Sequence, residues 1–158
     1  MGKSRNAELV SWLDVPGGGQ VWIDGTTLYI GHMRPPHGTT VVDVADPRAP
    51  RVLHHIPIPM GWHSHKVRVA NGIMLVNHEK FGQGAEEFGA GLGVYDVSRP
   101  GEPRPITKYR MGGKGVHRFT FDGRYAYISA TDDGYVGNFV GIVDFADPAR
   151  PVEVGRWW

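Results

Sequence analysis

Histidine is the residue type in this chain whose number and spacing point most directly to chemistry. The sequence holds eight histidines, and two of them, His63 and His65, flank a single serine in the segment GWHSHKVRVANG. Histidine is the commonest neutral metal ligand and the usual acid–base group near neutral pH. This segment fits both a metal site and the beginning of an ordinary strand. The strands that position its side chains must therefore be identified first.

The composition narrows the classes of protein that the chain can represent. It has 158 residues, a formal net charge of +1 and no cysteine. The absence of cysteine excludes disulfides, a thiolate zinc site and a cysteine nucleophile, and it fits a reducing compartment. The small net charge gives no broad field for nucleic acid, no apolar run has membrane-spanning length, and no nucleotide-binding fingerprint is present. We expect a cytoplasmic protein without nucleic-acid, membrane or nucleotide-cofactor partners.

The strongest pattern is an internal repeat, present three times, with a period of about 50 residues. In each unit a first strand ends in a tight turn, at Asp24-Gly25, Asn71-Gly72 and Asp122-Gly123. A second strand, a loop, a third strand, a proline-rich turn and a fourth strand follow. Four antiparallel strands per unit predict an all-β fold of β-propeller blades. We expect a lead-in over residues 1–17 and three blades over 18–158, at about 18–60, 61–111 and 112–158.

The third strand and the turn after it read VVDVADPRAP, VYDVSRPGEP and IVDFADPARP in the three units. These segments resemble the LVIVD repeat, and the resemblance covers nearly all of the chain from about Gly18 onward. It implies a β-propeller but little about activity, because propellers carry many unrelated functions. We expect the recurring Asp43, Asp96 and Asp144 to accept hydrogen bonds from the turn amides rather than to bind metal.

Three blades do not close a propeller, which needs 4–8 blades on the general rule. Three blades leave two open sides, and exposed edges and apolar faces pair with something. We expect half of a ring that is completed by a second copy of the chain or by the blades of a longer protein. A monomeric mass in light scattering would exclude the homodimer.

The repeat sorts the histidines by place. His65 and His117 occupy the same position in their units, with apolar residues two and four positions later. Each is expected to open the first strand of its blade, and the first strand of a blade lines the central channel. The first unit has Gly19 and Gln20 there. We predict a transition metal (iron, copper, zinc or manganese) bound by His65 and His117, with His63 and His32 as further ligands. The alternative is that these histidines only hydrogen-bond the backbone at the channel mouth.

Two further sets of residues complete the predicted site. His78 closes a second strand and is followed by Glu79, a pair that could orient a ligand or transfer a proton in catalysis. Lys66 and Arg118 each follow a channel histidine, and together with Gln20 they are the predicted substrate-binding residues. A solvated or blade-bridging role is the alternative for the two cations.

The residues thus support two functions of different classes. The first is a metal-dependent enzyme, an oxidoreductase or a lyase, that acts on a small organic molecule at a histidine-lined channel. The second is a non-catalytic propeller that binds a protein partner on its loop face. The metal content of the purified protein discriminates between them.

Overall fold

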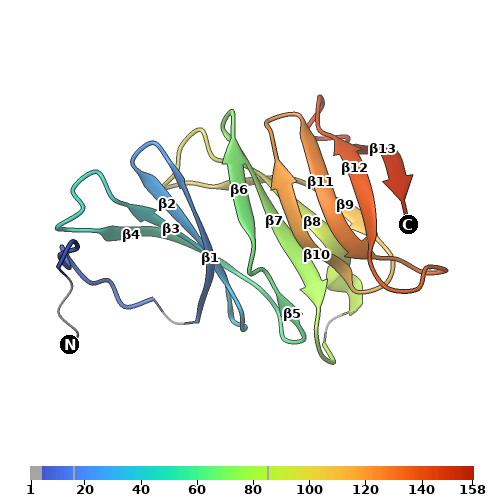
Figure 1. Ribbon diagram of the computed structural model, residues 1–158, viewed down its shortest axis with the longest axis horizontal. Helices are drawn as coiled ribbons and strands as arrows, with labels where there is room; N and C mark the ends of the chain where they lie inside the picture. The colour runs from blue at the N-terminus through green and yellow to red at the C-terminus, as the bar shows by residue number, and fades with distance from the viewer. Residues whose placement is uncertain (1–4, 16, 85) are drawn as a thin grey trace.

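The computed structural model describes residues 5–15, 17–84 and 86–158, and these are organised almost entirely as β-strands. Figure 1 shows β1 to β4 at one side of the molecule, with β4 outermost, and β11 to β13 at the other side, next to the C-terminus. Within these ranges no helix has the length and apolar character needed to cross a bilayer. The elements are β1 (Gly18–Asp24), β2 (Thr27–His32), β3 (His37–Asp43), β4 (Arg51–Pro57), β5 (Trp62–His63), β6 (Val67–Ala70), β7 (Ile73–Lys80), the 3₁₀ turn η1 (Glu86–Phe88), β8 (Ala90–Asp96), β9 (Arg104–Met111), β10 (Gly115–Phe121), β11 (Tyr125–Thr131), β12 (Phe139–Asp144) and β13 (Val152–Trp157).

The strands form three antiparallel groups. Strands β1 to β4 form one sheet in chain order, and β6 to β9 and β10 to β13 form two further four-stranded series. The second and third series touch where Glu79 of β7 pairs with Gly115 of β10. This arrangement confirms the prediction of an all-β fold made of antiparallel propeller blades. We refer to β1–β4, β5–β9 and β10–β13 as the first, second and third blades.

Turn chemistry explains where the strands end. Asn71 and Gly72 have φ values of 53° and 74°, the combination that a tight hairpin turn requires and that asparagine and glycine tolerate best. Each third strand ends on an aspartate whose carboxylate accepts the amide hydrogen bond of the residue two positions later. These acceptors are Asp43 (2.9 Å), Asp96 (2.9 Å) and Asp144 (2.8 Å). The predicted structural role of these carboxylates is confirmed.

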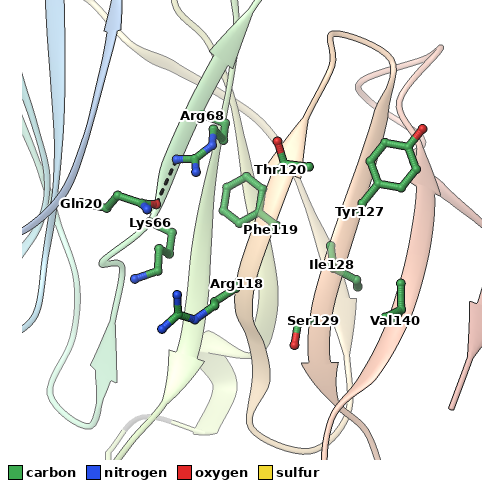
Figure 2. Close-up of a pocket in the computed structure, with 10 residues that line it drawn as sticks. All are labelled: Gln20, Lys66, Arg68, Arg118, Phe119, Thr120, Tyr127, Ile128, Ser129 and Val140. Atoms are coloured by element: carbon green, nitrogen blue, oxygen red, sulfur yellow. Dashed lines mark hydrogen bonds between the residues drawn. The ribbon is translucent and has the colours of Figure 1, made fainter.

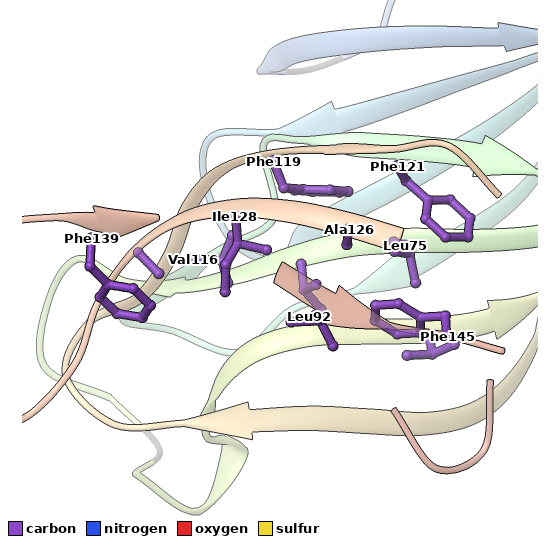
Figure 3. Close-up of a cluster of buried hydrophobic side chains, with 12 residues drawn as sticks. Leu75, Leu92, Val116, Phe119, Phe121, Ala126, Ile128, Phe139 and Phe145 are labelled. Atoms are coloured by element: carbon purple, nitrogen blue, oxygen red, sulfur yellow. The ribbon is translucent and has the colours of Figure 1, made fainter. Parts of the chain in front are cut away.

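The second blade is packed between the other two. On one face, Met74 and Val76 of β7 pack against Tyr29 and Val41 of the first blade. On the other face, Leu75 and its neighbours meet the third blade. Figure 3 shows this larger cluster, which comprises Leu75, Leu92, Val94, Val116, Phe119, Phe121, Ala126, Ile128, Ala130, Phe139, Val143 and Phe145. Alternating side chains of β7 therefore serve two cores, as strand geometry dictates.

The first strand of the second blade departs from the expectation, since it is not continuous and does not begin at His65. The short strand β5 and strand β6 both pair with β7, and the chain between them turns toward the first blade. There Ser64 O accepts a hydrogen bond from His32 N, and His65 O accepts one from Gln20 N, each at 3.0 Å. The approach is so close that a Cβ on Gly31 would lie 2.6 Å from the carbonyl carbon of His65. Contact between blades therefore breaks the strand and fixes His65 in the gap.

Candidate functional site

Glu79 of β7 is the centre of the polar cluster at the junction of the second and third blades. Its Oε2 accepts a hydrogen bond from His63 Nε2 at 2.7 Å, and its two oxygens lie 3.1 and 3.0 Å from His117 Nδ1. Strand register explains both contacts. His63 is the direct cross-strand partner of Glu79, and β10 joins β7 at the same residue through Gly115. The pairing of β10 is irregular at His117, and such bulges commonly redirect a side chain toward a site.

His65 completes the cluster. Its ring centroid lies 4.2 Å from that of His63 and 5.5 Å from that of His117. Candidate ligand atoms of His63, His65 and Glu79 all lie within 4.8 Å of one another, so these three residues could hold a metal ion. The structure thus brings two of the predicted metal ligands, His63 and His65, together with a residue predicted to be catalytic. The third predicted ligand, His117, binds the same carboxylate from the side of β10.

The charge states of the cluster suit metal binding. Burial, reinforced by the positive fields of His63 and Lys66, lowers the pKa of His65 to about 4, so this imidazole is neutral at physiological pH. Burial raises the pKa of Glu79, but the hydrogen bonds from His63 and His117 outweigh that effect, and the net pKa is lowered. A neutral imidazole and an ionised carboxylate are the forms that coordinate a cation.

Asn77 holds this arrangement in place, although the sequence patterns did not single it out. Its Oδ1 accepts a hydrogen bond from Lys66 N at 2.8 Å, and its Nδ2 donates to Val116 O at 3.0 Å. The same Nδ2 lies 3.3 Å from His65 Nδ1. The side chain is fully buried, and an amide in the middle of the apolar segment IMLVNH needs buried partners. A polar asparagine within an apolar strand segment is the sequence signal that could have identified Asn77.

The cluster opens to the surface beside His63. The His63 ring stacks on Phe81 with centroids 4.9 Å apart and ring planes at 17°. Both residues line a pocket of about 400 Å³ whose other walls include Met33 and Met60. His63 is therefore the member of the cluster that lines this pocket, whose other lining residues are mostly apolar and include one cation, Arg34.

His32, the fourth predicted metal ligand, lies apart from this group. It is fully buried, and its Nε2 is 2.7 Å from Thr40 Oγ1. The same hydroxyl is 3.0 Å from His55 Nδ1. The side chain of His32 thus belongs to a polar chain within the first blade, and its backbone N–H reaches the segment that carries His65.

His78 also points away from its predicted partner. His78 and Glu79 are consecutive in β7, so their side chains leave opposite faces of the strand. The His78 ring is buried 4.6 Å from the Phe88 ring, and its Nδ1 has no hydrogen-bond partner among the described residues. The structure therefore does not place His78 and Glu79 where they could act on one group.

Lys108 lies against the Phe88 ring and gives the stability of the fold a testable dependence on pH. Its Nζ lies 3.4 Å from the Phe88 ring centroid and donates to Phe88 O. Burial, with a contribution from the charge of Arg110, lowers the pKa of Lys108 to about 8. Above that pH the folded chain has lost a proton that the unfolded chain keeps until its ordinary pKa of 10.5. The free energy of unfolding should therefore rise with pH in this window.

We expect Lys108→Met to reduce that rise by on the order of 1 kcal/mol, with allowance for solvent screening. The measurement is urea unfolding at a series of pH values from about 8 to about 10. Lys114→Met, at an exposed position, is the matched control and should leave the slope unchanged. Equal slopes for wild type and Lys108→Met would contradict the prediction.

The predicted substrate-binding residues lie around one pocket. Gln20, Lys66 and Arg118 all line a pocket of about 340 Å³, which Figure 2 shows together with Arg68. Arg68 was not predicted. Its Nη1 donates a hydrogen bond to Gln20 Oε1 at 2.9 Å and so connects the first and second blades.

Comparison with protein-family models gives a match in the third blade. Residues 120–157, which contain the third strand and the proline-rich turn of the third blade, match the LVIVD repeat. That family is known to form β-propeller repeats. None of the curated proteins compared with the chain matches it.

Proposed function

Since this chain carries an LVIVD repeat of the β-propeller type, we propose that it is a metal-dependent enzyme that acts on a small organic molecule. The reaction would take place at the channel end where the second and third blades meet. The observation that carries the proposal is the group His63, His65 and Glu79, whose ligand atoms lie within 4.8 Å of one another. One member of the group, His63, also lines an open pocket, and the repeat pattern alone does not account for such a group.

The donor set fits a transition metal. Two imidazoles and one carboxylate are typical of catalytic zinc and of non-haem iron(II) sites that keep positions open for substrate. Tetrahedral coordination at ordinary bond lengths would separate two ligand atoms by about 3.3 Å. His63 Nε2 and Glu79 Oε2 are now 2.7 Å apart and joined by the proton that Nε2 donates. A cation between them would displace that proton and would require an opening of only a fraction of an ångström.

His65 must change its tautomer to bind through Nε2. The amide of Asn77 is oriented by Lys66 N and Val116 O, so it presents its N–H to His65 Nδ1. The neutral imidazole then carries its proton on Nε2, and coordination through Nε2 requires the other tautomer. The hydrogen bond from Asn77 to His65 is 3.3 Å long and therefore weak, so breaking it costs little compared with what metal coordination contributes.

Each remaining residue of the cluster has a definite task in this proposal. A bound metal would supply Lewis acidity, the property that oxidoreductase and lyase chemistry on small molecules can use. His117 Nδ1 donates to Glu79 and holds that carboxylate in position, as outer partners of metal ligands commonly do. Phe81 fixes the plane of the His63 ring by stacking. The pocket beside Met33 and Met60 provides access.

Cobalt(II) titration tests the proposal. Protein treated with a chelator and freed of any affinity tag is titrated with Co²⁺, while visible absorption reports the coordination geometry. We expect one equivalent to bind with the absorption of a four- or five-coordinate ion. His54→Ala, which removes a histidine outside the cluster, should behave as wild type. Absence of binding to well-folded wild-type protein would refute the metal centre.

A further inference from the structure

The pocket in Figure 2 gathers positive charge from more than one blade. Lys66 and Arg68 come from the first-strand segment of the second blade, and Arg118 comes from β10 of the third. Gln20 of β1 joins them from the first blade. Figure 2 shows the nitrogen ends of Lys66 and Arg118 on the same side of Phe119. No carboxylate is among the described residues that line this pocket.

Two of these cations have no direct polar partner for their charged groups among the described residues. Within the described part of the chain, neither Lys66 Nζ nor the Arg118 guanidinium forms a hydrogen bond or an ion pair. By contrast, Arg51, Arg124 and Arg156 are each paired with a carboxylate at 2.6 to 3.0 Å. Ion pairs give these three arginines a structural role. Lys66 and Arg118 have no such ion pair in the described ranges, so their position in the pocket requires another explanation.

The electrostatics support the same conclusion. Lys66 and Arg68 are half-buried, and both line the pocket together with Arg118. Like charges that are held together and partly removed from water favour the binding of an anion between them.

The remaining walls suit an organic group rather than a bare ion. Phe119 and Val140 contribute apolar surface, while Tyr127 and Ser129 contribute hydroxyl groups. Pockets with an apolar wall and a few polar groups are typical sites for small organic ligands. The volume of about 340 Å³ admits a metabolite of modest size.

We infer that this pocket binds a small organic anion, with its carboxylate or phosphate group between Lys66 and Arg118 and its organic part against Phe119. Arginine offers a planar pair of donors to such a group, and lysine offers a point charge. Gln20 and Arg68 close the side toward the first blade through their mutual hydrogen bond.

This inference names the substrate class of the proposed enzyme, and it rests on the proposed function only for the reaction that follows binding. Lys66 directly follows His65, and Arg118 directly follows His117. The field of Glu79 also acts on Lys66. The anion pocket and the candidate metal ligands are thus carried by the same two backbone segments.

Calorimetric titration of chelator-treated protein tests the binding step without metal. The probes are succinate and inorganic phosphate, with the uncharged diamide of succinate as the negative control. We expect one of the two anions to bind and the diamide not to bind, and the preferred anion identifies the acidic group. Arg118→Gln and Lys66→Gln should each weaken binding by about tenfold or more. Arg118 is exposed, so its variant should fold as wild type does.

The control variant is Arg48→Gln, which removes the same charge from an exposed turn, and it should bind as wild type does. Equal affinity in wild type and Arg118→Gln, or no binding of either anion, would overturn the inference. Anion binding without any Co²⁺ binding would support the pocket while refuting the metal centre. Co²⁺ binding without anion binding would support the metal centre and refute the anion pocket.

Discussion

Glu79→Ala should lower the affinity of the chelator-treated protein for Co²⁺ by at least about 100-fold. Loss of an outer partner of a metal ligand costs 10–100-fold on the general scale, and Glu79 is proposed as a ligand itself. It is also the acceptor that orients both His63 and His117. Its removal therefore takes away one ligand and leaves a second, His63, without the hydrogen bond that fixes its ring.

Glu102→Ala is the matched control for this experiment, because Glu102 is an exposed glutamate of the turn before β9 and its loss should not change the affinity. His63→Ala is the second arm and should weaken Co²⁺ binding to a similar extent. Circular dichroism establishes that each variant is folded. Affinity within a factor of about three of wild type for both Glu79→Ala and His63→Ala would exclude these residues as ligands.

Asn77→Leu should lower the free energy of unfolding by about 3 kcal/mol. The leucine has nearly the same size, but it cannot accept from Lys66 N or donate to Val116 O, which the asparagine does at 2.8 and 3.0 Å. Both backbone groups would be left without these partners in a buried place, at a cost of about 1–3 kcal/mol each. Urea unfolding followed by circular dichroism measures the loss.

Asn138→Leu makes the same chemical change at an exposed position and should alter stability by less than about 0.5 kcal/mol. The comparison separates the hydrogen bonds of Asn77 from the general effect of an added apolar side chain. If the two variants were equally stable, Asn77 would not be the residue that holds the His65 segment.

Local patterns predicted the fold because its elements are set by local chemistry. Asn71-Gly72 specifies a tight turn through the φ values that these residues tolerate, and Asp43 caps the following turn with its own carboxylate. Three copies of each pattern then predict repeated antiparallel strands. These are contacts between residues a few positions apart, and a single sequence contains all the information about them.

The site could be predicted only in part, because contacts between blades decide it. The repeat identified His65 and His117, and spacing suggested His63, but Glu79 on a different strand is the residue around which they gather. The break before β6 arises from Ser64 and His65 bonding to the first blade. The sequence pattern of the second unit does not predict this contact with the first blade. For the same reason, His32 and His78 were grouped with residues from which the structure separates them.

Other predictions from the sequence remain predictions. They include the blade limits, the cytoplasmic location and the completion of a ring by a second copy or by further blades. The third blade does expose apolar side chains, namely Val140, Val152, Val154 and Trp157. Such a surface is compatible with a covering partner.

The metal content of the native protein tests the central claim most directly. The untagged chain is purified without added metal, and its iron, copper, zinc and manganese are measured by elemental analysis against protein concentration. We predict close to one equivalent of a transition metal, which a chelator removes and which Glu79→Ala lacks. Well-folded protein with no metal above background would contradict the metal centre and favour a non-catalytic propeller that binds a protein partner.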